Sequence, residues 1–135
     1  MALSDSAAIA GELRRLLPHA HAPYSGVHVA AAVEDADGGV HYGVNVENAA
    51  YPQGVCAEAS AISAMVTSGR AAIRRVWVAS SLPGLIWPCG GCRQKIWEFS
   101  QAGCEVVSVG RDGTEERHTI EALLPLGFRL EPRGA

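Results

Sequence analysis

Residues 54–60, "GVCAEAS", place a thiol and a carboxylate two positions apart among small residues. A buried cysteine alone behaves as a small hydrophobic residue, but an acid beside it needs a partner or a function. The run from Cys56 to Ser68 is rich in Ala, Ile and Met and is followed by Gly69, which is typical of a helix and its C-terminal signal. The stretch therefore predicts that Cys56 and Glu58 lie at the start of a helix.

The segments around this helix predict a layered α/β domain. Apolar periodicity predicts a first helix that starts at Ser4 to Ser6 and stops at Pro18. Two β-rich runs, 27–33 and 40–46, flank "EDADGG" and predict an antiparallel hairpin. Later segments predict strands at 73–80, 104–109 and 115–118, and helices at about 90–101 and 119–124. The order α-β-β-α-β-α-β-β-α indicates one domain over residues 1–135, with helical crossovers between the later strands.

Composition excludes several classes of partner. The 135 residues suffice for a core without structural disulfides or metals. The net charge of −3, with 19% charged and only 6% aromatic residues, offers neither the basic track nor the stacking surface that a nucleic acid polymer requires. Met1 is followed by no basic and apolar leader, and no apolar run approaches a membrane span of about 18 residues. We therefore expect a cytoplasmic protein that binds a small, neutral ligand.

A second unusual stretch is "WPCGGCRQ", residues 87–94. Cys89 and Cys92 are predicted at a helix N-terminus, where free backbone N–H groups and the helix dipole favour thiolates. The C-x-x-C spacing suits a metal ligand pair, but it also suits a thiol redox pair or half of a structural four-cysteine zinc site. The motif alone leaves these alternatives open.

Cys56 changes the balance because it also opens a predicted helix. Three thiolates meeting at one sheet edge would leave one tetrahedral position of Zn²⁺ open, which is typical of a catalytic site. Glu58, in the first helical turn, could lie beside that position and carry a proton from the attacking water to a leaving group. The alternative is an ordinary first-turn acid favoured by the helix dipole. Cys104, inside a predicted strand, is expected in the core.

Four segments of the chain resemble the small, zinc-dependent cytidine deaminases of pyrimidine salvage. They are "APYSGVHVAAAV" at 22–33, "NVENAAYPQGVCAEA" at 45–59, "PCGGCRQ" at 88–94 and "EALLPLGF" at 121–128. They follow in family order and together extend over about residues 22–128. A zinc held by cysteine and a P-C-x-x-C pair, with a nearby non-ligating Glu, is the hallmark of such deaminases.

The resemblance implies a three-layer α/β/α fold around a five-stranded mixed sheet, assembled as a homotetramer. It implies that Cys56, Cys89 and Cys92 bind Zn²⁺. It makes Glu58 the proton shuttle in hydrolysis at C4 of cytosine, with ammonia as leaving group. Gln94 would support the zinc cysteines from behind.

The resemblance also assigns the nucleoside contacts. Asn45 and Glu47 match the pair that hydrogen-bonds the ribose hydroxyls, and the amide of Ala57 would lie on the pyrimidine. Without the resemblance, the segment around Asn45 would be interpreted as a solvated turn. Tyr51 and Phe128 match positions that reach the site of a neighbouring subunit, so active sites would be shared across an interface.

This chain departs from the family pattern at several positions. Ala59 stands where the family has an arginine aimed at the zinc thiolates, so the metal should be a weaker Lewis acid unless another cation compensates. Val27 replaces a phenylalanine that helps to wall the pyrimidine pocket, which predicts a roomier pocket. Ala30 and Arg129 replace glycines. These changes bear on substrate identity more than on reaction type.

Other functions remain as alternatives. The absence of Arg after C-A-E and the "LLPLGF" segment are similar to the blasticidin S deaminase branch, so a cytosine-nucleoside antibiotic or another modified base is the second substrate class. A binding module with a structural zinc, closed by a fourth ligand such as Glu58, is a different class of function, and a thiol redox protein built on Cys89 and Cys92 is another. The five histidines have no ligand spacing and receive no role.

Overall fold

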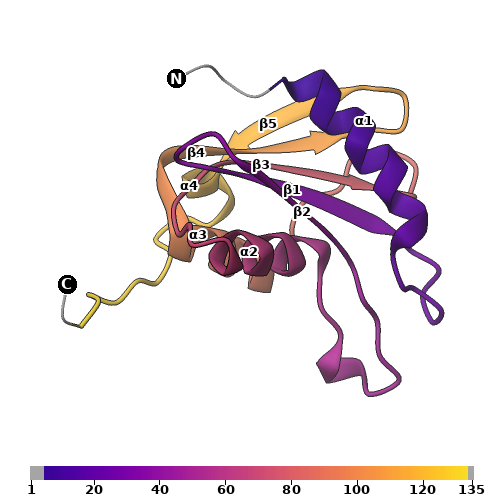
Figure 1. The fold of residues 1–135 in the computed structure, drawn as a ribbon, viewed down its shortest axis with the longest axis horizontal. Helices are drawn as coiled ribbons and strands as arrows, with labels where there is room; N and C mark the ends of the chain where they lie inside the picture. The colour runs from indigo at the N-terminus through magenta and orange to yellow at the C-terminus, as the bar shows by residue number, and fades with distance from the viewer. Residues whose placement is uncertain (1–4, 134–135) are drawn as a thin grey trace.

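The computed structural model describes residues 5–133 and confirms a three-layer α/β/α arrangement (Figure 1). A five-stranded sheet in the order β2-β1-β3-β4-β5 forms the middle layer. Helix α1 covers one face of the sheet, and α2, α3 and α4 cover the other. The helices are α1 (Ser6–Leu16), α2 (Ala57–Thr67), α3 (Gly90–Phe99) and α4 (Ile120–Leu123), with short 3-10 turns at Leu17–His19 and Tyr51–Gln53. The strands are β1 (Val29–Asp35), β2 (Val40–Val44), β3 (Ile73–Ser80), β4 (Ser100–Val109) and β5 (Glu115–Thr119).

The predicted first helix is present, and Asp5 caps its N-terminus. The Asp5 carboxylate accepts hydrogen bonds from the amides of Ala7 and Ala8, which satisfies two of the free N–H groups of the first turn. Ser4, part of the predicted start, lies outside the described residues.

Strand directions explain why two helices begin at the same end of the sheet. β1 pairs antiparallel with both β2 and β3, β3 pairs parallel with β4, and β5 pairs antiparallel with β4. β2, β3 and β4 therefore run in the same direction. Since α2 follows β2 and α3 follows β3, both helices start beyond the carboxyl ends of these strands, where α/β sheets usually bind ligands.

Small residues bring α2 directly onto the sheet. The inward face of β1 is Ala31 and Val33, and α2 contributes Ala57 and Ala61 to the same core. Gly43 of β2 has no room for a side chain, because a Cβ there would lie 2.4 Å from the backbone nitrogen of Ala61. The helix that carries the start "CAEA" is thus fixed by backbone contact rather than by long side chains.

The predicted hairpin between the first two strands is confirmed. The Asp35 carboxylate accepts hydrogen bonds from the amides of Asp37 and Gly39, and Gly38 adopts a positive φ of 88°. Both features stabilise a tight reversal of the chain.

Several strand boundaries differ from the sequence prediction. β1 extends to Asp35 rather than to Val33, β2 ends at Val44 rather than at Val46, and the starts of β1 and β4 also differ. β1 begins at Val29 rather than at Val27, because the side-chain amide of Asn45 takes the backbone hydrogen bonds that a partner strand would otherwise make there. β4 begins at Ser100, and its register with β3 shifts between Ile73 and Arg75. Cys104 lies buried in β4, as predicted for a core residue.

None of the helices in residues 5–133 combines the length and apolarity needed to cross a bilayer.

Candidate active site

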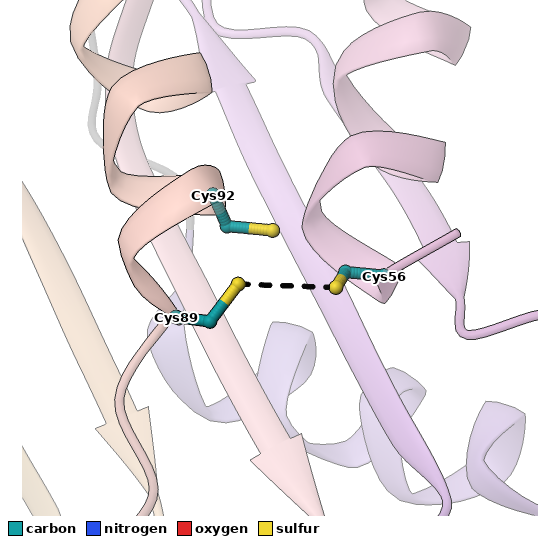
Figure 2. A group of neighbouring side chains, drawn as sticks. All are labelled: Cys56, Cys89 and Cys92. Carbon is teal, nitrogen blue, oxygen red and sulfur yellow. Dashed lines mark hydrogen bonds between the residues drawn. The ribbon is translucent and has the colours of Figure 1, made fainter. Parts of the chain in front are cut away.

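Three cysteines converge at the starts of α2 and α3 (Figure 2). Cys56 is the N-cap of α2, Cys89 is the N-cap of α3, and Cys92 lies in the first turn of α3. Their sulfur atoms lie within 4.8 Å of one another, and the Cys56 and Cys89 sulfurs are 4.0 Å apart. Tetrahedral Zn²⁺ with Zn–S bonds of about 2.3 Å would place its sulfurs about 3.8 Å apart. The cluster therefore has the dimensions of a three-thiolate zinc site.

The electrostatics of the cluster favour a bound cation. Burial, the nearby Glu58 and the other two thiols raise the pKa of Cys92, and burial is the main cause of the raised pKa of Cys56. A hydrogen bond from the backbone amide of Cys92 lowers the pKa of Cys89. The three thiols cannot all ionise cheaply by themselves, but a soft divalent cation would stabilise all three thiolates.

Glu58 lies in the first turn of α2, beside the cluster but outside the group of converging sulfur atoms. Only 4% of its surface is exposed. Burial raises the pKa of Glu58, and a backbone hydrogen bond and the positive charge of Lys95 lower it by less. A buried carboxyl group with a raised pKa beside a cavity is suited to taking up a proton and giving it back.

Glu58 and two of the cysteines open into a cavity of about 270 Å³ at the carboxyl ends of β2 and β3. Several predicted site residues meet there, from three separate segments of the chain. The lining residues are Ser25, Val27, Val29, Asn45, Glu47, Cys56, Ala57, Glu58, Ile86, Trp87 and Cys89.

Asn45 and Glu47 are held firmly at the mouth of this cavity. The Asn45 amide donates to the Val27 carbonyl at 2.9 Å and accepts from the Val29 amide at 2.8 Å. The Glu47 carboxylate accepts from the backbone amide and the hydroxyl of Ser25 and from the amide of Tyr24. These hydrogen bonds, above all that from the Ser25 hydroxyl, lower the pKa of Glu47. Glu47 is therefore a fixed, ionised acceptor.

The structure does not bring three of the predicted residues into the cavity of their own chain. Tyr51 is 76% exposed and its ring packs edge-on against Tyr24. Phe128 is 66% exposed on the C-terminal segment. Gln94, predicted to support the cysteines, lines a separate groove between α2 and α3 and donates a hydrogen bond to the Phe128 carbonyl at 2.9 Å.

Sequence analysis missed several residues that shape the site. Trp87 and Ile86 wall the cavity, and the Trp87 ring packs edge-on against His118 of β5. Arg93 donates hydrogen bonds to the carbonyls of Pro88 and Leu123, which ties the loop before Cys89 to the end of α4. Their position next to the C-x-x-C motif is the one sequence feature that points to them. Their contacts could not be predicted, because their partners lie in distant segments of the chain.

Comparison with known proteins identifies a family. Residues 8–109 match the family described as the cytidine and deoxycytidylate deaminase zinc-binding region. The cytidine deaminase of Mycoplasma pneumoniae is 40% identical over 120 residues, covering 87% of this chain and 90% of that protein. The cytidine deaminase of Sporosarcina psychrophila is 34% identical over 127 residues, covering 94% and 93%. The crystal structure of cytidine deaminase from Burkholderia pseudomallei superposes with a TM-score of 0.86 at 33% identity, covering 93% of this chain and all of that one.

Proposed function

The chain belongs to the cytidine and deoxycytidylate deaminase family, and from this premise we propose that it hydrolyses cytidine to uridine with release of ammonia. The observation that carries this function is the convergence of three cysteine sulfurs beside a buried Glu58 on one cavity. The relatives named above are cytidine deaminases, so an antibiotic such as blasticidin S is not the favoured substrate.

The chemistry divides between the metal site and Glu58. Cys56, Cys89 and Cys92 would hold Zn²⁺, which would supply the Lewis acidity that makes water a nucleophile at neutral pH. Glu58 accepts the proton that this water loses and delivers it to the exocyclic nitrogen of cytosine. A C–O bond forms at C4 and the C–N bond breaks, ammonia leaves with the proton that Glu58 delivers, and the second proton of the water ends on N3 of uridine. The raised pKa of Glu58 suits both halves of this proton transfer.

We assign one part of the cavity wall to the base and another part to the sugar. Val27, Ile86 and Trp87 line the cavity with an apolar surface that suits a flat base, and we assign the backbone amide of Ala57, on the same cavity, to the pyrimidine. The Glu47 carboxylate and the Asn45 amide hydrogen-bond the ribose hydroxyls. Support for this assignment comes from their fixed positions at the cavity mouth and from the ionised state of Glu47.

The assembly we propose is a homotetramer with shared active sites. Tyr51 and Phe128 are large aromatic side chains that are mostly exposed in the single chain, and burial against a partner would remove this apolar surface from water. Each would complete the site of a neighbouring subunit. Gln94, on the same helix as Cys92, would support the zinc cysteines, and its own side-chain hydrogen bond goes to the Phe128 carbonyl.

We place the enzyme in pyrimidine salvage in the cytoplasm, with residues 1–135 acting as one domain. The single sheet and the family match over residues 8–109 support one domain. Three thiols that must stay reduced to bind zinc suit a reducing compartment.

Glu58→Gln tests the proposed chemistry directly. The wild-type protein is expected to release ammonia from cytidine, and the variant to lose about 10²- to 10⁴-fold in kcat while it retains zinc, because the amide cannot carry the proton. Absorbance loss, ammonia release and zinc content measure these quantities for cytidine, deoxycytidine and blasticidin S.

Glu12→Gln is the matched control, since Glu12 lies on α1 across the sheet; it should keep full activity. A wild-type protein without stoichiometric zinc, or a Glu58→Gln variant with normal turnover, would refute the proposed function.

A further inference from the structure

The C-terminal segment 127–129 is anchored to α3 at Phe128 and just after it. Gln94 of α3 donates a hydrogen bond to the Phe128 carbonyl at 2.9 Å. The Arg129 guanidinium lies 4.1 Å from the centre of the Trp97 ring. Its Nη2 atom also donates to the carbonyl oxygens of Trp97 and Ser100. Trp97 lies in the last turn of α3 and Ser100 is its C-cap, so the guanidinium lies at the negative end of the helix dipole.

The backbone before Phe128 is equally constrained. A Cβ at Gly127 would lie 2.9 Å from the Trp97 ring, so the chain passes directly over the indole. Leu126 just before it adopts a positive φ of 57°, which a residue with a side chain rarely does. Within residues 5–133, the buried indole nitrogen of Trp97 has no hydrogen-bond partner. Trp97 therefore acts as a platform between the Gly127 backbone and the Arg129 guanidinium.

Phe128 and the two apolar residues that flank segment 127–129 have exposed side chains. Leu126, Phe128 and Leu130 are 103%, 66% and 73% exposed. A side chain with no role beyond its own chain gains nothing from a backbone fixed at several points, since ordering it costs conformational entropy. A fixed backbone with an exposed ring is what a preorganised contact to another molecule requires.

We propose that Arg129 is a positioning residue, which holds Phe128 through the Trp97 platform in the orientation that reaches the nucleoside bound by a neighbouring subunit. The inference rests on the proposed function, because it takes from it the role of Phe128. The new element is that the Arg129 guanidinium, stacked on the Trp97 indole, fixes the Phe128 ring. Arg129 itself touches no substrate.

Arg129→Met tests this role, since it keeps a long apolar side chain but loses the charge and the donors. If the ring then occupies its binding position about one tenth of the time, KM for cytidine rises about tenfold. We expect kcat at saturation to stay nearly unchanged, because the zinc cysteines and Glu58 do not contact the segment. The KM of Arg129→Lys should lie between those of the wild type and Arg129→Met, since lysine keeps the charge but not the planar guanidinium.

A double-variant cycle separates positioning from a direct contact. Phe128→Ala should raise KM at least as much as Arg129→Met, and the double variant should match Phe128→Ala alone, because Arg129 has no ring left to position. If the two effects multiply instead, Arg129 acts independently of Phe128 and the proposal is wrong.

Hydrogen–deuterium exchange of residues 124–130 gives a readout independent of turnover. Arg129→Met should speed exchange there and leave the starts of α2 and α3 unchanged, and Arg133→Met, which removes a nearby cation of the same segment, should change neither exchange nor KM. Faster exchange with an unchanged KM would overturn the proposal, as would slow exchange in both variants. A wild-type protein that does not deaminate cytidine would refute the proposed function instead, whatever the exchange shows. If Arg129→Met does not fold, Arg129→Lys and Arg129→Gln are judged by the same criteria.

Discussion

We propose that Val27 sets the width of the pocket that takes the base. Its side chain lines the cavity that also holds Glu58 and Ala57, and the family pattern has a larger phenylalanine there. Val27→Phe should fill this space and favour plain cytidine over N4-substituted cytidines, whereas Val27→Ala should favour the bulkier substrates. The ratio of kcat/KM for the two substrate types measures the shift, expected at about tenfold for a change of a few methylene groups. An identical ratio in all three proteins would show that Val27 does not limit the pocket.

Ala59 is neutral, whereas the family pattern has a positively charged arginine at this position. It lines the groove between α2 and α3 in which Lys95 also lies. Lys95 is the single lysine of the chain, and its charge lowers the pKa of Glu58 by less than burial raises it. Lys95 therefore offsets part of the cost of ionising the buried Glu58.

Among single residues, sequence patterns predict those that stand in a short motif with a fixed spacing. Cys56, Cys89 and Cys92 were predicted as one cluster because each opens a helix, and the structure places their sulfurs together. The contact of Trp87 with His118 was not predictable, because it joins segments about thirty residues apart and follows no spacing rule.

Among the elements, the contact between β2 and α2 determines where Cys56 and Glu58 lie. A methyl group at Gly43 would meet backbone atoms of Ala57 and Ala61 at 2.7 and 2.4 Å, so Gly43→Ala must push the helix from the strand. We expect a loss of about 1–3 kcal/mol in unfolding free energy, together with weaker zinc binding. Thermal unfolding and zinc competition with a chelator measure both.

Gly11→Ala provides the control for this prediction. Gly11 lies within α1, and a methyl group added there would meet no atom within 4 Å outside its own stretch of helix. Alanine should therefore stabilise the protein by about 0.5–1 kcal/mol. If Gly43→Ala proves equally harmless, the close approach of α2 to β2 does not position the metal site.

Helix starts were easier to predict than strand ends. The N-caps at Cys56 and Cys89 follow from local sequence, and both agree with the prediction. The starts of β1 and β4 depend on the Asn45 side chain and on a register shift between β3 and β4, which are tertiary features. Local propensity cannot supply such information.

For the whole molecule, the proposed sharing of active sites between subunits predicts that two inactive variants complement one another. Glu58→Gln subunits lack the proton shuttle but keep Phe128, and Phe128→Ala subunits keep the shuttle but lack the ring. Mixed oligomers of the two should contain sites with a wild-type KM, because each Phe128→Ala site can receive its ring from a Glu58→Gln neighbour. Steady-state kinetics of mixtures, with the assembly measured by native mass spectrometry, checks this outcome.

The comparison mixture pairs Phe128→Ala with the Glu58→Gln/Phe128→Ala double variant, which has no ring to offer. It should retain the high KM of Phe128→Ala alone. Equal KM values in the two mixtures would mean that Phe128 serves only its own chain.

The separation of the cysteines along the chain also orders events during biosynthesis. Cys56 leaves the ribosome 33 residues before Cys89, and the intervening β3 has to pair with β1 before the two helix starts can face each other. A binding site of this kind rarely exists in an unfolded chain. The nascent polypeptide can therefore capture its ion only after α3 has been synthesised, and until then its bare thiols depend on the surrounding reductants for protection.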